Sequence, residues 1–337
     1  MSRRVLSLAS IVAVGALMPA VVQAQAAGPL TPWGDPDLQG TYTNKTTTPL
    51  QRPDDLGDRE YLTEEEVSER EQAALQRNED LLLAAARPTA AGGNVGAYNN
   101  FWLDGGTRPT GRTSLIYDPP SGRLPSLTQE ADRIRAAARV ARAEADWWGD
   151  LELNDRCLTW QAGPPMLPSA YNNNFMILQT PDYVAIQVEM IHDTRIIPLD
   201  GRPHLPTVVR QWNGDMRGHW DGDTLVVETT NLTRTAANAA ATGGDPILLR
   251  ASNGRSDDTV TVTERITRLD AGTLNYQFTI QDSTTWTTSF SGEFPLRLLA
   301  EDELLYEYAC HEGNYSMEGI LAGERVLEKA ALRGSVR

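Results

Sequence analysis

The stretch 259-TVTVTERITRLDAGTLNYQFTIQ-281 decides the fold class of this chain. Apolar and polar side chains alternate on both sides of a turn at Asp270-Ala271-Gly272. Two sets of side chains each share one face: Val260, Val262, Glu264 and Ile266 before the turn, and Leu274, Tyr276, Phe278 and Ile280 after it. A period of two is typical of strands with one buried face and one face in water. We therefore predict an antiparallel β-hairpin here.

Similar segments follow one another through the second half of the chain. We expect strands at 174–179, 183–193, 195–199, 206–212, 223–230, 258–268, 273–282, 284–292 and 304–312. About nine short strands separated by turn residues predict a mainly β fold, either an antiparallel lipocalin-like barrel or a sandwich. We assign residues 166–337 to this barrel. Residues 27–165 are expected to form an N-terminal arm and helical wrap outside it, in one structural unit with the barrel.

The segment before the strands has a different composition. Residues 27–60 are rich in Pro, Thr, Gly and Asp, and predict an extended arm with one short strand at 40–44. A capping box opens a helix over 63–86, and a second helix is expected over 126–147. Both helices should pack against the outside of the barrel.

The first 26 residues are typical of a secretory signal peptide. Arg3 and Arg4 precede an apolar run, and small residues at Ala24 and Ala26 suit cleavage. A retained membrane anchor is the alternative, but no later apolar run reaches the ~18 residues of a spanning helix. We expect a periplasmic or secreted chain that does not contact the membrane after cleavage.

The charge of the chain limits its partners. The formal net charge is −15, from 30 basic and 45 acidic residues. Loss of Arg3 and Arg4 with the leader leaves 28 basic against 45 acidic residues, a charge of −17. An acidic surface argues against nucleic acid or anionic lipid as a partner. It also disfavours strongly anionic polymers, unless a local basic cluster exists.

The chain has only two cysteines, Cys157 and Cys310. In an oxidising compartment they predict one disulfide. A disulfide between Cys157 and Cys310 would close the long loop of chain between them. In the chain-entropy model this closure would raise the free energy of unfolding by roughly 4–5 kcal/mol. The alternative is a pair of free thiols, one of them a nucleophile.

Histidines and carboxylates near strand ends are candidates for acid–base catalysis, because an imidazole beside a carboxylate can move protons near neutral pH. The candidates are His311, His192, Glu189, Asp193, Glu312 and His204. On a regular strand His192 and Asp193 would point to opposite faces, so they would form a dyad only at a bulge. For each histidine the alternative is an ordinary solvated or core-edge residue.

A second set of residues suits substrate binding: Arg195, Arg217, Arg210, Trp212, Tyr171 and Asn173. Aromatic rings stack on a sugar or an aromatic ring, and a guanidinium binds an oxygen or a developing oxyanion. The alternative is a hairpin whose tryptophans cover the end of the barrel, with asparagines that satisfy their own turns. The sequence lacks HExxH, CxxC, calcium-loop, GxSxG and GxGxxG patterns, so we expect no metal and no other cofactor.

Several long motifs resemble a family of uncharacterised secreted proteins of bacteria that scavenge complex organic matter. These motifs are 98-YNNFW-102, 188-VEMIHDTRIIPLDGRPHLP-206, 220-WDGDTLVVETTN-231 and 306-YEYACHEGNY-315. The resemblance spans nearly the whole mature chain. It implies one domain family and a periplasmic setting, and it implies no particular reaction.

The sequence is consistent with two candidate functions. The first is a periplasmic, cofactor-free lyase, isomerase or hydrolase that acts on a neutral, oxygen-rich small molecule, such as a plant glycoside, another metabolite or an aromatic ether. The second is a lipocalin-like protein that binds a small molecule without catalysis. A third hypothesis is a purely structural protein, but the polar side chains at the strand ends argue against it.

Overall fold

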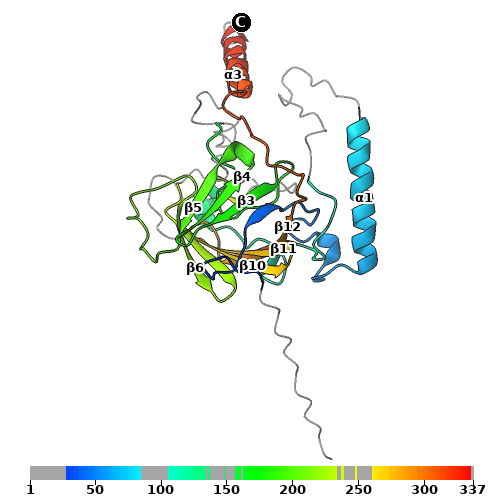
Figure 1. The fold of residues 1–337 in the computed structure, drawn as a ribbon. Coiled ribbons are helices and arrows are strands. Elements are labelled where there is room, and N and C mark those ends of the chain that lie inside the picture. Colours follow the sequence, from blue (N-terminus) through cyan, green and yellow to red (C-terminus); the bar gives the residue numbers. More distant parts are fainter. Residues whose placement is uncertain are drawn as a thin grey trace, which may run out of the picture.

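The fold is mainly β (Figure 1), built on an antiparallel sheet of ten strands that nearly closes into a barrel. The computed structural model describes residues 28–84, 105–133, 136, 148, 156–160, 162–233, 237–238, 247–248 and 260–334. The predicted signal peptide, the 98–102 motif and most of the predicted second helix lie outside these residues. The ten-stranded sheet confirms the prediction of a barrel rather than a sandwich. The helices of the fold lie outside this sheet.

The sheet has the order β5-β4-β3-β1-β12-β11-β10-β7-β6, with β2 paired to β12. Its strands are β1 (Gly40–Thr43), β2 (Ile116–Asp118), β3 (Asn174–Gln179), β4 (Tyr183–Val188), β5 (Thr194–Pro198), β6 (Asp215–Asp221), β7 (Thr224–Thr230), β10 (Thr261–Asp270), β11 (Thr273–Gln281) and β12 (Phe290–Leu298). A separate pair consists of β8 (Ala237–Asn238) and β9 (Ile247–Leu248). The predicted hairpin is β10–β11, with Glu264 opposite Phe278.

The barrel closes where the two ends of the sheet meet. Nε of Arg195 on β5 donates to Sδ of Met216 on β6 over 3.3 Å. Gly218 on β6 packs so closely that an added Cβ would lie 2.7 Å from Ile197 and 2.8 Å from Leu199. Side-chain packing therefore joins β5 to β6.

Aromatic side chains and one ion pair fill the interior. The ring centroids of Tyr276 and Phe294 are 4.8 Å apart, and Phe278 stands edge-on to Phe290 at 6.5 Å. Beside them the guanidinium of Arg195 forms a buried two-pronged ion pair with the carboxylate of Glu264. The Tyr276 hydroxyl donates to the same carboxylate over 2.5 Å. Because these side chains fill the interior, a ligand site would have to lie at the barrel's ends or on its outer face.

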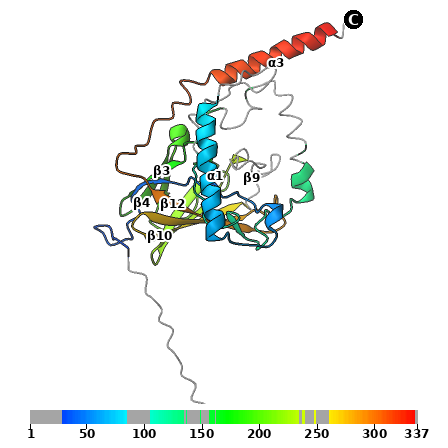
Figure 2. The same cartoon turned by 90° about the vertical axis from the view of Figure 1, so that its right-hand side faces the viewer.

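Residues before the barrel domain cover its outer face and also enter the sheet. β1 pairs with both β3 and β12, so the predicted arm supplies an interior strand. Arg112 bonds Glu60 at 2.7 Å and Glu293 of β12 at 3.3 Å, which fastens the covering segment. Helix α1 (Glu64–Leu83) runs alongside the barrel (Figure 2) and begins with the predicted capping box of Thr63 and Glu66.

The C-terminal segment differs from the prediction. Residues 304–312 alternate like a strand but form none. They lead into helix α3 (Tyr315–Gly334), which projects from the barrel (Figure 2) and was not predicted. Residues 304–312 are held by hydrogen bonds to Glu189 and His192, which follow β4, and by a disulfide at Cys310. The backbone of this segment therefore has hydrogen-bond partners outside the sheet.

Three other strand predictions also need correction. Residues 206–212 form no strand, and β12 begins at Phe290 rather than at 284. β4 ends at Val188 instead of continuing to 193, because Ile191 and His192 take left-handed backbone conformations with φ of 61° and 44°. Within the described residues, no helix combines the length and apolar character needed to span a membrane.

Candidate active site

A row of polar residues crosses four neighbouring strands on the outer face of the sheet. Arg297 of β12 lies opposite Thr43 of β1, and Thr43 lies opposite Asn174 of β3. The backbone N–H of Glu189, directly after β4, donates to the Asn174 carbonyl over 3.0 Å. Three strand spacings separate Arg297 from Glu189, about 14 Å between backbones. The register thus assembles a cation, a hydroxyl, an amide and a carboxyl in one line.

Glu189 has the most unusual environment in this row. It is only 4% exposed, and Oε1 accepts a long 3.4 Å hydrogen bond from Tyr306 N–H. Within the described part of the chain, no atom completes a hydrogen bond with Oε2. Burial raises the pKa of Glu189, and this outweighs the opposing effects of the Tyr306 N–H, of Lys45 and of the amides of Asn174 and Asn172. A carboxyl of this kind can hold or release a proton closer to neutral pH.

His192 ends the same short turn, Met190–His192, that follows Glu189. Its backbone N–H donates to the Glu189 carbonyl over 3.1 Å. Its Nδ1 lies 2.8 Å from the Tyr308 carbonyl, which can only accept, so Nδ1 carries the proton. In the neutral tautomer that carries this proton, Nε2 is the nitrogen that can accept a proton. Left-handed backbone at a branched residue such as Ile191 is rare and accompanies functional sites.

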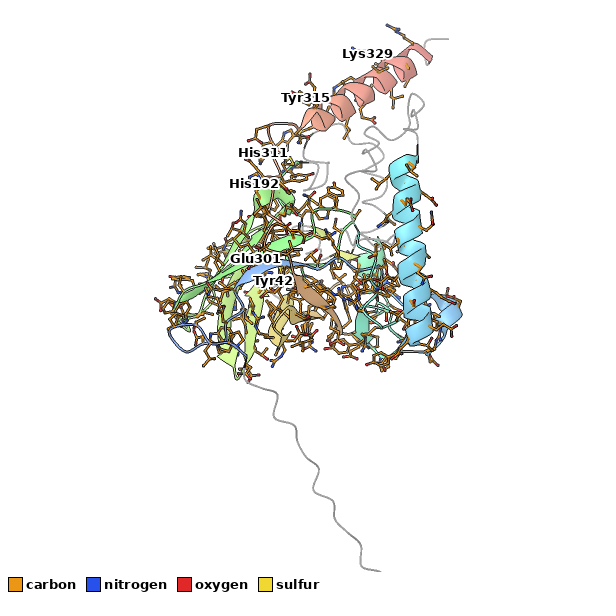
Figure 3. All side chains as sticks on the ribbon, turned by 45° about the vertical axis from the view of Figure 1, so that its right-hand side comes forward. Tyr42, His192, Glu301, His311, Tyr315 and Lys329 are labelled. Atoms are coloured by element: carbon orange, nitrogen blue, oxygen red, sulfur yellow. A yellow bond between two sulfur atoms is a disulfide. The ribbon has the colours of Figure 1, made fainter. Side chains whose placement is uncertain are left out.

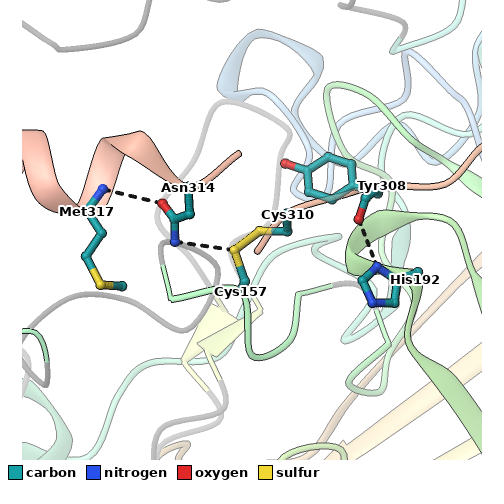
Figure 4. Close-up of a disulfide and its surroundings, with 6 residues drawn as sticks. All are labelled: Cys157, His192, Tyr308, Cys310, Asn314 and Met317. Carbon is teal, nitrogen blue, oxygen red and sulfur yellow. Dashed lines mark hydrogen bonds between the residues drawn. A yellow bond between two sulfur atoms is a disulfide. The ribbon is translucent and has the colours of Figure 1, made fainter. Parts of the chain in front are cut away.

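The predicted disulfide holds the segment that contacts both residues (Figure 4). Cys157 and Cys310 are joined, with Cα atoms 5.7 Å apart, so neither is a free nucleophile. The Cys310 N–H donates to the same Tyr308 carbonyl that His192 contacts. The bond spans 153 residues, worth about 5 kcal/mol in the chain-entropy model. The disulfide therefore fixes the Tyr306–Cys310 segment over the turn after β4.

Other predicted residues support neighbouring loops. Asn173 is fully buried and exchanges two hydrogen bonds with the backbone of Ser169, at 2.7 and 2.8 Å. Tyr171 packs edge-on against Trp160 with centroids 5.8 Å apart. Asp193 accepts from the Asn213 amide over 2.6 Å. These contacts position the loops beside Glu189.

A second ionic cluster lies on β6 and β7. Nδ1 of His204 is 2.9 Å from Oδ2 of Asp215, and Nε2 is 3.2 Å from Oε1 of Glu228. Arg217 donates to Oδ1 of Asp215 over 2.7 Å. Burial alone would raise the pKa of Asp215, but hydrogen bonds from Leu205 N–H, His204 and Arg217 together lower it. Carboxylates thus lie at both ring nitrogens of His204, whereas the Nε2 of His192 has no such neighbour among the described contacts.

The remaining predicted site residues lie away from Glu189 and His192. Figure 3 shows His311 between His192 and the start of α3, on a turn where His311 and Glu312 are exposed. Arg210 donates to the Leu232 carbonyl over 3.1 Å, and Trp212 is 36% exposed on the same loop. Arg195 lies in the core, as described above. Of the predicted catalytic residues, Glu189 and His192 are joined by a backbone hydrogen bond, and both contact the Tyr306–Cys310 segment.

Several members of the site were not singled out by the sequence analysis. These are Thr43, Lys45, Arg297 and Tyr306. Strand alternation does indicate outward-facing polar residues, but it does not indicate which strands become neighbours. No group of three or more His, Cys, Asp or Glu side chains within the described residues is arranged to hold a metal ion. No protein-family model and no curated protein matches the chain.

Proposed function

We propose that this chain is a periplasmic or secreted enzyme that performs cofactor-free acid–base chemistry on an oxygen-rich small molecule, as a lyase, isomerase or hydrolase. The observation that carries the proposal is the buried carboxyl of Glu189, with its raised pKa and an oxygen, Oε2, that has no hydrogen-bond partner among the described residues. Neither a buried strand end nor a turn needs such a group, because burying an unpartnered polar atom costs stability. Acid–base catalysis supplies a reason to keep it.

The two groups have different roles in this proposal. Glu189 exchanges a proton with the substrate, because its raised pKa makes it a better base than an ordinary carboxylate. His192 is the partner, with Nδ1–H fixed by the Tyr308 carbonyl and Nε2 left to accept or return a proton. Asn174 and Thr43 of the same row hydrogen-bond substrate hydroxyl groups.

The test is turnover of a plant-metabolite extract, followed by untargeted mass spectrometry. Wild type and E189Q are compared, with E301Q as the matched control, because Glu301 is exposed on the turn after β12 (Figure 3). We expect wild type and E301Q to convert a compound and E189Q to lose at least a hundredfold in rate. Loss of water identifies a lyase, gain of water a hydrolase, and an unchanged mass at a shifted retention time an isomerase.

Two results would contradict the proposal. If E189Q is folded and keeps the wild-type rate, Glu189 takes no part in the reaction. A compound that co-purifies unchanged with all three proteins identifies the chain as a binding protein, the alternative function.

A further inference from the structure

Helix α3 has no packing partner in the described part of the chain. It projects from the barrel, with Tyr315 at its start and Lys329 toward its far end (Figure 3), and no other described helix or strand packs along it. Gly319 and Gly323 lie inside it, and each glycine costs a helix about 1 kcal/mol relative to alanine. Helices in proteins gain most of their stability by packing one face against another element. Among the described residues, nothing supplies this packing for α3.

One face of α3 is free of charged side chains. Residues three and four positions apart lie on the same side of a helix. Along this side the residues are small or apolar: Gly319, Ile320, Gly323, Val326, Leu327 and Ala330. Val326 and Leu327 are 65% and 62% exposed, so the face is open where they lie. The small residues would let a second helix approach closely, because the distance between packed helices depends on the side chains at the contact.

The charges of α3 are divided between its two halves. Arg325 and Glu328 pair with each other over 3.0 Å. Four other charged side chains make no ion pair within 4.0 Å with any described residue: Glu318, Glu324, Lys329 and Arg333. The two carboxylates of this set lie in the first half of the helix, and the two cations lie in the second half.

The net charge of α3 differs from that of the rest of the chain. Its three acidic and three basic side chains cancel, whereas the whole chain carries a charge of −15. Two copies of so acidic a protein repel each other, and salt confines this repulsion to distances of about 10 Å. A neutral helix that projects from the barrel is therefore a place where two copies can meet with little repulsion.

We propose that α3 packs antiparallel against α3 of a second copy of this chain, with the charge-free face between the two helices. In this arrangement each acidic half lies opposite the basic half of the other copy, whereas a parallel pair would bring like charges together. The positive end of each helix dipole also lies beside the negative end of the other. A two-fold axis closes the pair, so both copies use the same face. The inference is independent of the proposed function.

The first test is the oligomeric state, measured by sedimentation velocity across a wide range of protein concentration. L327E places a charge within the charge-free face. L82E is the matched control, because Leu82 is 59% exposed on α1, against 62% for Leu327. We expect wild type and L82E to form dimers as concentration rises, and L327E to raise the dissociation constant by about tenfold or more. Thermal unfolding checks that each variant is folded. Wild type that stays monomeric, or an L327E dimer as tight as that of wild type, would overturn the inference.

The second test uses the division of charge. E318K/E324K makes both halves of α3 basic, and K329E/R333E makes both halves acidic. Each variant alone should stay monomeric, because halves of like charge then meet, and a mixture of the two should form a heterodimer. Circular dichroism checks that α3 stays helical. If either variant dimerises alone as wild type does, or if the mixture forms no complex, the antiparallel pairing of α3 is wrong.

Discussion

At the scale of single residues, Glu189 is a carboxyl whose charge the fold disfavours. Its carboxyl is buried and has a raised pKa, which the long hydrogen bond from Tyr306 N–H and the amides of Asn174 and Asn172 do not offset. His204 contrasts with it, since that ring lies between two carboxylates. The environment of Glu189 opposes ionisation of its carboxyl, whereas a carboxylate oxygen lies within 3.2 Å of each ring nitrogen of His204.

The pKa of Glu189 predicts how stability depends on pH. Below its ordinary value of 4.5 the carboxyl is protonated in both the folded and the unfolded chain. As the pH rises above 4.5, the unfolded chain ionises first, so the free energy of unfolding falls until the pH passes the raised folded pKa. E189Q lacks this contribution and should become more stable relative to wild type across that window. Urea unfolding at a series of pH values measures the difference, and a difference that stays constant with pH would contradict the assignment.

At the scale of elements, the hairpin of β11 and β12 depends on a glycine opposite an aromatic ring. Gly292 lies opposite Phe278, whose ring covers it. A Cβ added at Gly292 would lie 2.4 Å from Cζ of Phe278 and 3.0 Å from the Leu115 carbonyl oxygen. Glycine is therefore required by the close approach of a ring and a neighbouring backbone.

G292A should consequently lower the free energy of unfolding by about 1–3 kcal/mol, the usual cost of overpacking a core. G272A in the β10–β11 turn is the control, because the nearest atom to its added Cβ is 3.8 Å away. Guanidinium unfolding with both variants measures the effect. Equal stability of G292A and wild type would show that the Phe278 ring moves aside without cost.

At the scale of the whole molecule, the barrel is not confined to residues 166–337. β1 (Gly40–Thr43) lies between β3 and β12 and is hydrogen-bonded to both. Cys157 also precedes the barrel segment and is bonded to Cys310 near its end. The chain before residue 166 thus supplies a strand and a cross-link.

A chain of residues 166–337 alone should therefore fail to fold. Without β1, strands β3 and β12 become open edges, and the Tyr42 ring is lost from the core. Circular dichroism and denaturant unfolding should show no cooperative transition, whereas residues 28–337 should unfold cooperatively. A cooperative transition in the shorter chain would mean that β3 and β12 can pair directly.

The sequence by itself determined the features that depend on near neighbours. Strand alternation predicted β10–β11, the Thr63–Glu66 spacing predicted the start of α1, and the two cysteines predicted their bond. These follow from backbone periods, from capping over one turn and from the absence of any other cysteine, so no knowledge of distant contacts is required.

Only the tertiary structure decided the composition of the candidate site. Arg297, Thr43, Asn174 and Glu189 come from four segments far apart in the chain, and their alignment depends on strand order and register. The segment 304–312 has a strand's alternation, yet its hydrogen bonds go to the turn after β4. The physical reason is that alternation specifies which side chains share a face, whereas the neighbours of that face are set by how the barrel closes.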